Sequence, residues 1–170
     1  MIVSGRPGPR PTGGPGRPAL RRPVCARAAT MGHMRDGNLV GLWDSSLYDY
    51  GVMESSWVCL RPDGTGWSAW ANAGGAATSR LRWSCPGDGE VELRYTWTAE
   101  GRFAPGAPPF LVDVDDEGPD DTVVRTRFRV GPDTPPLSAS PVTCLHVEEG
   151  IEYCHQFALV TRDVEDGPHV

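Results

Sequence analysis

From Asn38 onward, short runs of apolar and aromatic residues alternate with turns rich in glycine, proline and aspartate. Within each run, residues two apart share their character, which is the period of a β-strand with one buried face. Almost no part of the chain has the 3.6-residue period of an amphipathic helix. Eight strands are therefore expected, over residues 38–46, 55–62, 66–72, 78–85, 91–97, 122–130, 142–147 and 151–162.

Eight consecutive strands joined by short turns are typical of a barrel in which the sheet closes on itself. The expected fold class is all-β, an eight-stranded up-and-down antiparallel barrel preceded by a disordered tail. The interior of so small a barrel is either packed with side chains or holds one small ligand. The sequence thus predicts a fold more directly than a function.

Two turns have strong local signals. The segment Pro62-Asp63-Gly64 predicts a hairpin, because Asp-Gly tolerates a positive φ. A second hairpin is expected at residues 86–89, where a three-residue loop would place Arg82 opposite Glu92 on the outer face. In the strand at 122–130, the inward positions are Val124, Thr126, Phe128 and Val130, while Arg125, Arg127 and Arg129 face water.

The last hairpin is expected to reverse at Glu148-Glu149-Gly150, since Gly150 suits the left-handed position of a three-residue loop. That register sets Cys144 directly across from Cys154. Both remain reduced thiols in a reducing compartment and bridge only if oxidised. None of the five cysteines forms a Cys-x-x-Cys pair, so free thiols on strands are the expected state.

Composition separates the chain into three regions. Residues 1–35 carry seven arginines, no acidic residue and many prolines and glycines, which predicts a disordered tail. Residues 36–165 form the expected barrel, and residues 166–170 a short C-terminal tail. Met31 and Met34 lie just before the strand pattern begins, so translation is expected to start there, with the preceding residues an over-long gene start.

Charge and hydropathy limit the partners. Residues 36–170 carry nine arginines against 22 acidic residues, and so acidic a domain repels the phosphate backbone of nucleic acids. No apolar run approaches the roughly 18 residues of a membrane span, and no secretory signal is present. A cytoplasmic protein is expected, a monomer or a homodimer, without nucleic-acid or membrane partners.

Three features together resemble the calycins, which include the lipocalins, the fatty-acid-binding proteins and small bacterial lipocalin-like proteins. These are Gly41-Leu42-Trp43 on the first strand, Arg162 at the end of the last strand, and the eight strands between them. The strand-turn-strand at residues 60–66 is also similar to that of bacterial lipocalin-like domains. The resemblance implies that Trp43 closes one barrel end and that Arg162 packs across its indole, a contact of roughly 1–2 kcal/mol.

An aromatic interior would suit a flat or polyenic apolar molecule. The same rings could instead fill a small barrel completely, and both interpretations remain open. The candidate ligand-binding residues are Trp67, with Trp70 as the other choice on that strand, and Trp83, Tyr95, Trp97, Phe128, Tyr153, His155 and Phe157.

Candidate chemistry is sparse. His155 shares a strand face with Tyr153 and Phe157 and is the one catalytic candidate, although a lone histidine without a carboxylate partner is more often a core or rim residue. Residues 113–118 begin like a calcium loop but lack the closing glutamate, which favours an exposed acidic loop. No metal site and no cofactor are predicted.

Three functions therefore stand. The first is a binding protein for a small hydrophobic or aromatic molecule held inside the barrel. The second is a cyclase or isomerase that folds a reactive apolar substrate there, steered by polar groups such as His155, Tyr95 or Tyr153. The third is a protein-interaction domain with a filled barrel and an arginine-rich outer face.

Overall fold

The computed structural model describes residues 36–48, 54–104 and 110–164. The tails expected at 1–35 and 166–170 lie outside these residues. The strands are β1 (Gly41–Asp44), β2 (Ser55–Leu60), β3 (Thr65–Asn72), β4 (Gly75–Gly87), β5 (Glu90–Ala104), β6 (Phe110–Gly118), β7 (Val123–Asp133), β8 (Val142–Ile151) and β9 (Cys154–Thr161). The helical elements of the described chain are two 3-10 turns, η1 (Gly37–Leu39) and η2 (Ser46–Tyr48), and neither could span a membrane.

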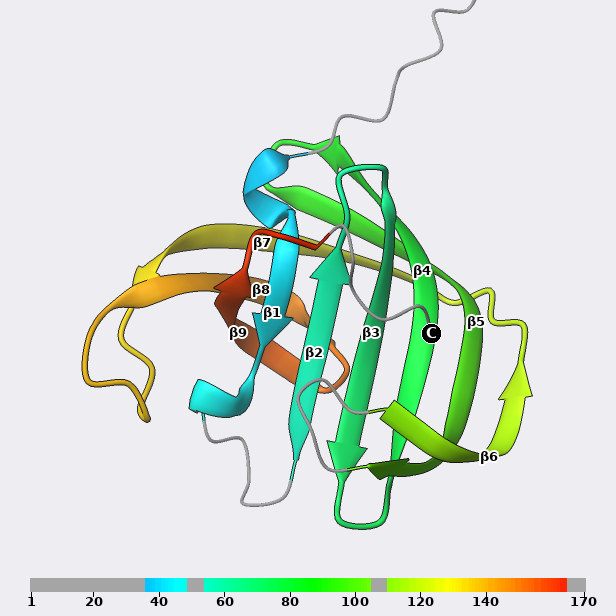
Figure 1. Cartoon of the computed structure of the whole chain (residues 1–170). Helices are drawn as coiled ribbons and strands as arrows, with labels where there is room; N and C mark the ends of the chain where they lie inside the picture. The colour runs from blue at the N-terminus through cyan, green and yellow to red at the C-terminus, as the bar shows by residue number, and fades with distance from the viewer. Residues whose placement is uncertain (1–35, 49–53, 105–109, 165–170) are drawn as a thin grey trace, which may run out of the picture. The chain divides into compact units, whose positions relative to one another are not determined.

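The strands form one closed antiparallel barrel (Figure 1). Neighbours follow the order β4-β3-β2-β1-β9-β8-β7-β5, and pairing between β4 and β5 closes the ring. These eight strands are the eight predicted from the alternation of apolar and polar residues. The fold class expected from the sequence, an eight-stranded up-and-down barrel, is confirmed.

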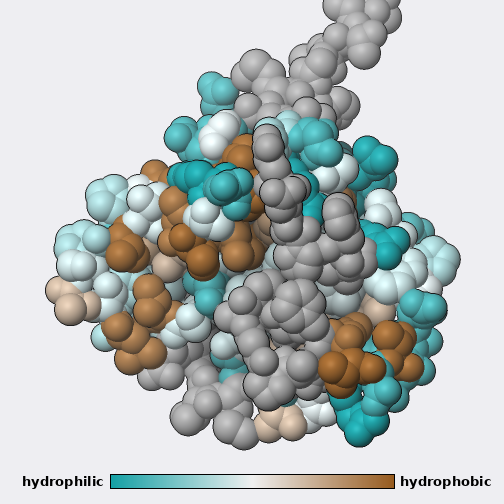
Figure 2. All heavy atoms as spheres, viewed as in Figure 1, coloured by the Kyte–Doolittle hydropathy of each residue, from teal (hydrophilic) through white to brown (hydrophobic). Residues whose placement is uncertain are grey.

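β6 is a ninth strand that the sequence analysis missed. The segment expected as an acidic loop pairs with the far half of β5, outside the barrel ring. Gly101 permits this pairing, because a side chain there would collide with the carbonyl oxygen of Asp113. In Figure 2, a hydrophobic group appears where Figure 1 places β6, which carries the exposed Val112 and Val114.

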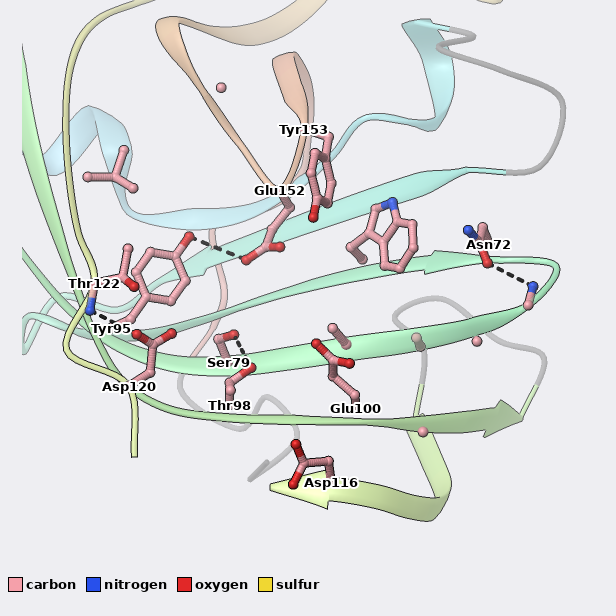
Figure 3. Close-up of a pocket in the computed structure, with 18 of the residues that line it drawn as sticks. Asn72, Ser79, Tyr95, Thr98, Glu100, Asp116, Asp120, Thr122, Glu152 and Tyr153 are labelled. Atoms are coloured by element: carbon pink, nitrogen blue, oxygen red, sulfur yellow. Dashed lines mark hydrogen bonds between the residues drawn. The ribbon is translucent and has the colours of Figure 1, made fainter. Parts of the chain in front are cut away.

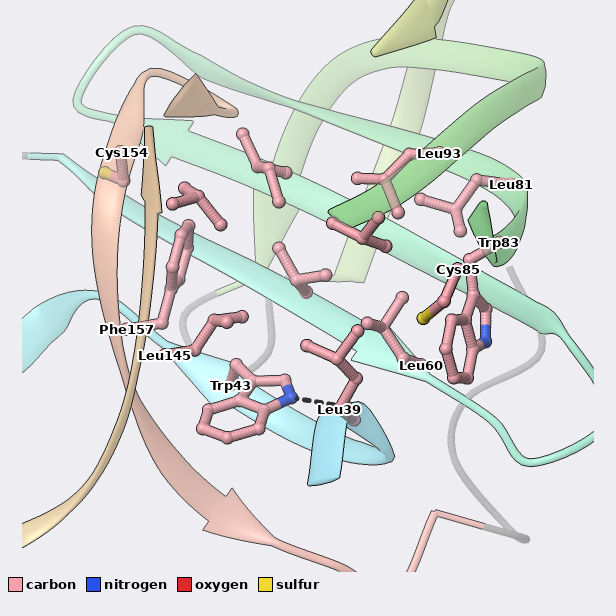
Figure 4. Packing of buried hydrophobic residues seen from close by; sticks show 14 of the residues in the cluster. Leu39, Trp43, Leu60, Leu81, Trp83, Cys85, Leu93, Leu145, Cys154 and Phe157 are labelled. Carbon is pink, nitrogen blue, oxygen red and sulfur yellow. Dashed lines mark hydrogen bonds between the residues drawn. The ribbon is translucent and has the colours of Figure 1, made fainter. Parts of the chain in front are cut away.

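One end of the barrel, here called the closed end, is filled with apolar side chains (Figure 4). Leu39 of η1 and Trp43 of β1 are fully buried there, and the Trp43 Nε1 donates a hydrogen bond to the Leu39 carbonyl at 2.9 Å. The Arg162 guanidinium lies 5.1 Å from the centre of the Trp43 ring and donates to the carbonyls of Asn38 and Val40. The contact implied by the calycin resemblance is thus present.

A second apolar cluster lies on the outer face of β2 and β3, where Trp57, Cys59, Trp67 and Ala69 point away from the interior. The chain after β9 crosses this face. Val164 packs into the cluster, and its carbonyl accepts a hydrogen bond from Arg61 Nε at 3.3 Å. Both faces of β3 are therefore largely buried, so its alternation does not reveal which face is inside.

The predicted reversal of the last hairpin is wrong. The chain reverses at Glu152 and Tyr153, and Glu148-Glu149-Gly150 lies in a bulge of β8, between the paired residues His146 and Ile151. Cys144 therefore pairs with Ala158, on the outer face, while Cys154 joins the interior cluster. Cys59, Cys85, Cys144 and Cys154 are all buried free thiols, as expected for this part of the chain.

The β4–β5 hairpin also differs from its expected register. A bulge after Ser84 leaves Gly87 opposite Glu90, so Glu92 faces Ser84 and Arg82 faces Arg94. Glu92 instead forms ion pairs with Arg125 at 2.6 Å and with Arg94 at 3.2 Å. Its carboxylate thus balances the arginine-rich outer face of β7.

Candidate functional site

The other end of the barrel, here called the open end, contains a cavity of about 990 Å³. Its floor is formed by small inward-facing residues, among them Ala77 and Ser79 of β4 and Thr98 of β5. Ser68 of β3, directly opposite Ser79, is also inward and fully buried. Because these side chains are short, they leave unfilled the space that leucine and tryptophan occupy at the closed end.

Glu152 enters this cavity from the β8–β9 turn (Figure 3). Glu152 and Tyr153 have φ values of 47° and 67°, the conformation of a two-residue type I′ turn. Asparagine and glycine are the residues preferred at these positions. Glu152 and Tyr153 therefore each carry a backbone strain of order 1 kcal/mol or more. Ser56 anchors the turn, since its hydroxyl donates to the Glu152 carbonyl at 2.7 Å.

The Glu152 carboxylate is held by two donors, one on β3 and one on β5, the two strands that flank β4. Ser68 Oγ donates to Oε1 at 2.6 Å, and the Tyr95 hydroxyl donates to the same oxygen at 3.3 Å. No donor among the described residues reaches Oε2, the second carboxylate oxygen. Glu152 therefore presents a positioned acceptor to whatever occupies the cavity (Figure 3).

The surroundings of Glu152 shift its titration. Burial raises the pKa of the Glu152 carboxyl, the hydrogen bonds from Ser68 and Tyr95 oppose that rise, and the charge of Asp120 adds to it. Burial and the nearby Glu152 charge also raise the pKa of the Tyr95 hydroxyl well above its usual value. Tyr95 therefore keeps its proton and donates a hydrogen bond at neutral pH. Ionisation of the Glu152 carboxyl is less favourable here than it is in water.

Aromatic rings form one wall of the cavity. Trp70 of β3 and Tyr153 of the turn meet edge to face, with ring centres 5.6 Å apart. The Trp70 Nε1 is buried and has no hydrogen-bond partner in the described structure. The Nε1 atoms of Trp57 and Trp67 in the outer cluster are in the same state, so this feature alone does not indicate a ligand.

Apart from His155, the charged residues of the lining are acidic. Besides Glu152, the cavity is lined by Glu100, Asp115, Asp116, Asp120 and Glu149, which come from β5, β6, the chain before β7, and β8. None of the described lining residues is an arginine, and His155 is the one basic side chain among them. No three His, Cys, Asp or Glu side chains in the described ranges are grouped closely enough to hold a metal ion. The acids thus create a diffuse negative potential and no chelating site.

No family model matches this chain, and neither a curated protein nor a solved structure matches it. The geometry and chemistry of the cavity are therefore the basis for the functional conclusion.

The structure divides the predicted ligand-binding residues into three groups. Tyr95, Tyr153 and His155 line the cavity, and the side chain of Tyr153 is 77% exposed at its rim. Trp83 and Phe157 lie in the filled core, with Phe128 packed against it. Trp67 and Trp97 are on the outer face of the barrel. His155 is exposed, and its ring lies near the bulge at Gly150.

A bulge explains the position of Trp97. The β4–β5 register pairs Leu81 with Tyr95 but Arg80 with Trp97, so one extra residue, Thr96, lies between them on β5. This insertion reverses the alternation and turns Trp97 outward, where the Arg80 guanidinium lies 4.6 Å from its ring centre. On β3 the inward tryptophan is Trp70, the other choice that the sequence analysis left open.

Sequence reasoning missed the central residue, Glu152. The available signal was a charged residue near the start of the strand expected at 151–162, between the apolar Ile151 and Cys154. The inward serines were also missed, because alternation identifies large apolar residues and is silent about the space that small ones leave. Neither signal indicates that the Glu152 carboxylate is the group that faces the cavity.

Proposed function

We propose that this protein binds a small organic molecule in the cavity at the open end of its barrel. The observation that carries the proposal is the division of the interior: apolar side chains fill the closed end, whereas short side chains leave about 990 Å³ at the other. That volume lies at the upper end of the range typical of small-molecule sites. The rings of Trp70, Tyr95 and Tyr153 would contact a flat or aromatic part of the ligand, and Glu152 a polar part.

We also propose that the barrel is of the calycin kind. The supporting observations are the eight-stranded antiparallel ring and the Arg162 guanidinium over the Trp43 indole. A calycin-like barrel closed at one end and open at the other is consistent with a ligand entering beside the β8–β9 turn.

Native mass spectrometry tests the binding function directly. The protein is purified from a native-like host and measured under gentle and denaturing conditions, and a retained compound of a few hundred daltons is the expected result. Ala77→Trp, which fills the cavity floor, should abolish retention. Ala139→Trp, at an exposed loop position away from the cavity, is the matched control and should retain the compound.

Retention that survives Ala77→Trp would refute the proposed site. A protein without bound compound, combined with failure to bind any member of a chemically diverse library, would refute the function. A concentration-dependent dimer with an empty cavity would favour the interaction-domain alternative.

Acid–base catalysis is a second candidate function, favoured by one observation. Glu152, whose carboxyl pKa is raised by burial, accepts a hydrogen bond from Tyr95, a pairing that suits proton transfer to or from a bound substrate. The retained compound would be incubated with fresh protein and analysed for conversion. Conversion that Glu152→Gln abolishes without loss of binding would establish catalysis, and recovery of the unchanged compound would refute it.

A further inference from the structure

We infer that the ligand carries a positive charge, as an organic ammonium group, and that Glu152 is its counter-ion. This inference rests on the proposed binding function and specifies its ligand class. It starts from the geometry of the carboxylate. Both protein donors, Ser68 and Tyr95, bind Oε1, so Oε2 remains available as an acceptor inside the cavity.

The charges around the cavity favour the same class. Five further acids line it, no described lining residue is an arginine, and the acids come from several separate elements. Low-dielectric walls lined by one sign of charge concentrate the field and attract the opposite charge. An anionic ligand would be repelled by the acids of β5, β6 and β8, and a neutral ligand would leave the half-buried Glu152 without a charge partner.

The aromatic wall explains why an organic cation is favoured over a metal ion. The described acids do not converge into a chelating group, whereas the Trp70 and Tyr153 rings meet in the wall of the cavity that Glu152 also lines. A tryptophan or tyrosine face attracts an ammonium group within about 6 Å. An ammonium ion on an aromatic or apolar body would thus satisfy the carboxylate and the rings together.

A matched series of ligands tests the inference. The probes are 2-phenylethylamine, 2-phenylethanol and 3-phenylpropionate, which share an arene and differ in charge, and affinity is measured by isothermal titration calorimetry at pH 7.5 and low salt. The amine should bind at least about tenfold more tightly than the alcohol, and the carboxylate most weakly. The preference for the amine should decrease as salt is raised.

Two variants of the β8–β9 hairpin assign the effect to Glu152. Glu152→Gln keeps an oxygen acceptor for Ser68 and Tyr95 but removes the charge, and it should reduce amine affinity about tenfold and alcohol affinity by much less. Glu148→Gln, on the same hairpin but outside the cavity lining, is the control and should change neither.

Equal affinity for amine and alcohol, or an amine preference that survives Glu152→Gln, would overturn the inference but leave the binding function standing. The same holds if the compound retained in the native mass spectrum is neutral or anionic. Absence of binding by all three probes would also count against the inference, whereas the binding function would be judged by the mass spectrum and the library.

Discussion

The two ends of the barrel share strands, β4 among them, but are filled in opposite ways. At the closed end, β1, β2 and β4 direct Trp43, Leu60 and Trp83 inward, and all three are buried within one apolar cluster. At the open end, the continuing β3, β4 and β5 direct Ser68, Ser79 and Thr98 inward.

This difference separates the packed core from the proposed binding site along the barrel axis. Apolar burial of roughly 25 cal/mol per Å² is concentrated where large side chains interlock. The open end contains instead a strained turn and a carboxyl in an unfavourable environment. Such local costs are typical of sites whose geometry is selected for binding.

The largest effect is expected at the closed end. Trp43→Ala should lower the free energy of unfolding by about 3–5 kcal/mol, because it removes a fully buried indole and leaves a cavity. Trp97→Ala, at a tryptophan on the outer face, should cost about 1 kcal/mol or less. Urea denaturation measures both free energies of unfolding. Similar losses for the two variants would contradict the placement of Trp43 in the packed interior and Trp97 on the outer face.

A smaller loss is expected from the polar network of the open end. Ser68→Ala removes a hydrogen bond to a charged group and should cost about 1.5 kcal/mol. Ser79→Ala, directly opposite on β4, removes a bond between two neutral hydroxyls at 3.0 Å and should cost about 0.5–1 kcal/mol. If Ser79→Ala proves the more costly in thermal unfolding, Glu152 is not the centre of this network.

The strained turn predicts a gain in stability. Tyr153→Gly should raise the free energy of unfolding by about 0.5–1 kcal/mol, since glycine adopts a φ of 67° without strain. The same change removes the ring beside Trp70 and should weaken ligand binding. Tyr153→Phe keeps both the ring and the strain, so it should change neither property. A loss of stability in Tyr153→Gly would show that the aromatic contact outweighs the backbone strain.

The smallest effect is a pH dependence. Because the folded protein raises the pKa of Glu152 above 4.5, the usual value for a glutamate carboxyl, the folded state binds this proton more tightly than the unfolded state. The contribution of Glu152 to stability is thus greatest below pH 4.5 and decreases as the pH rises toward its folded pKa. Glu152→Gln should therefore gain stability relative to the wild type as the pH rises from the ordinary glutamate range toward neutrality, measured as a difference in denaturation midpoints. A difference that stays constant over this range would mean that the carboxyl is not perturbed.

The barrel could be predicted because its ring of strands depends on the alternation of apolar and polar residues and on local turn signals. Strand β7 directs Val124, Phe128 and Val130 toward the core as their spacing indicates, and the Pro62–Gly64 hairpin lies where Asp-Gly places it. Arg162 and Trp43 meet across 119 positions of the sequence, a contact that only the family resemblance suggested.

The site was less predictable because it depends on departures from alternation. One inserted residue on β5 turns Trp97 outward, and a bulge at Glu148–Gly150 moves the reversal to Glu152 and Tyr153. Gly150 correctly indicated that the strand is interrupted there. The local preference of glycine does not distinguish a bulge from a turn, so the type of interruption was not predictable. Which carboxylate faces the cavity depends on that register, so Glu152 could not be identified in advance.

β6 gives the closed barrel a free strand edge. It stands last in the strand order, pairing with β5 on one side and with no other strand of the described chain. Its exposed valines, Val112 and Val114, would favour pairing with a strand of another molecule. Asp113 lies between them, however, and Asp115 and Asp116 follow directly after. Charged side chains on an edge oppose the addition of a strand from another molecule. Asp115 and Asp116, which line the proposed binding cavity, thus also oppose pairing of the β6 edge with a strand of another molecule.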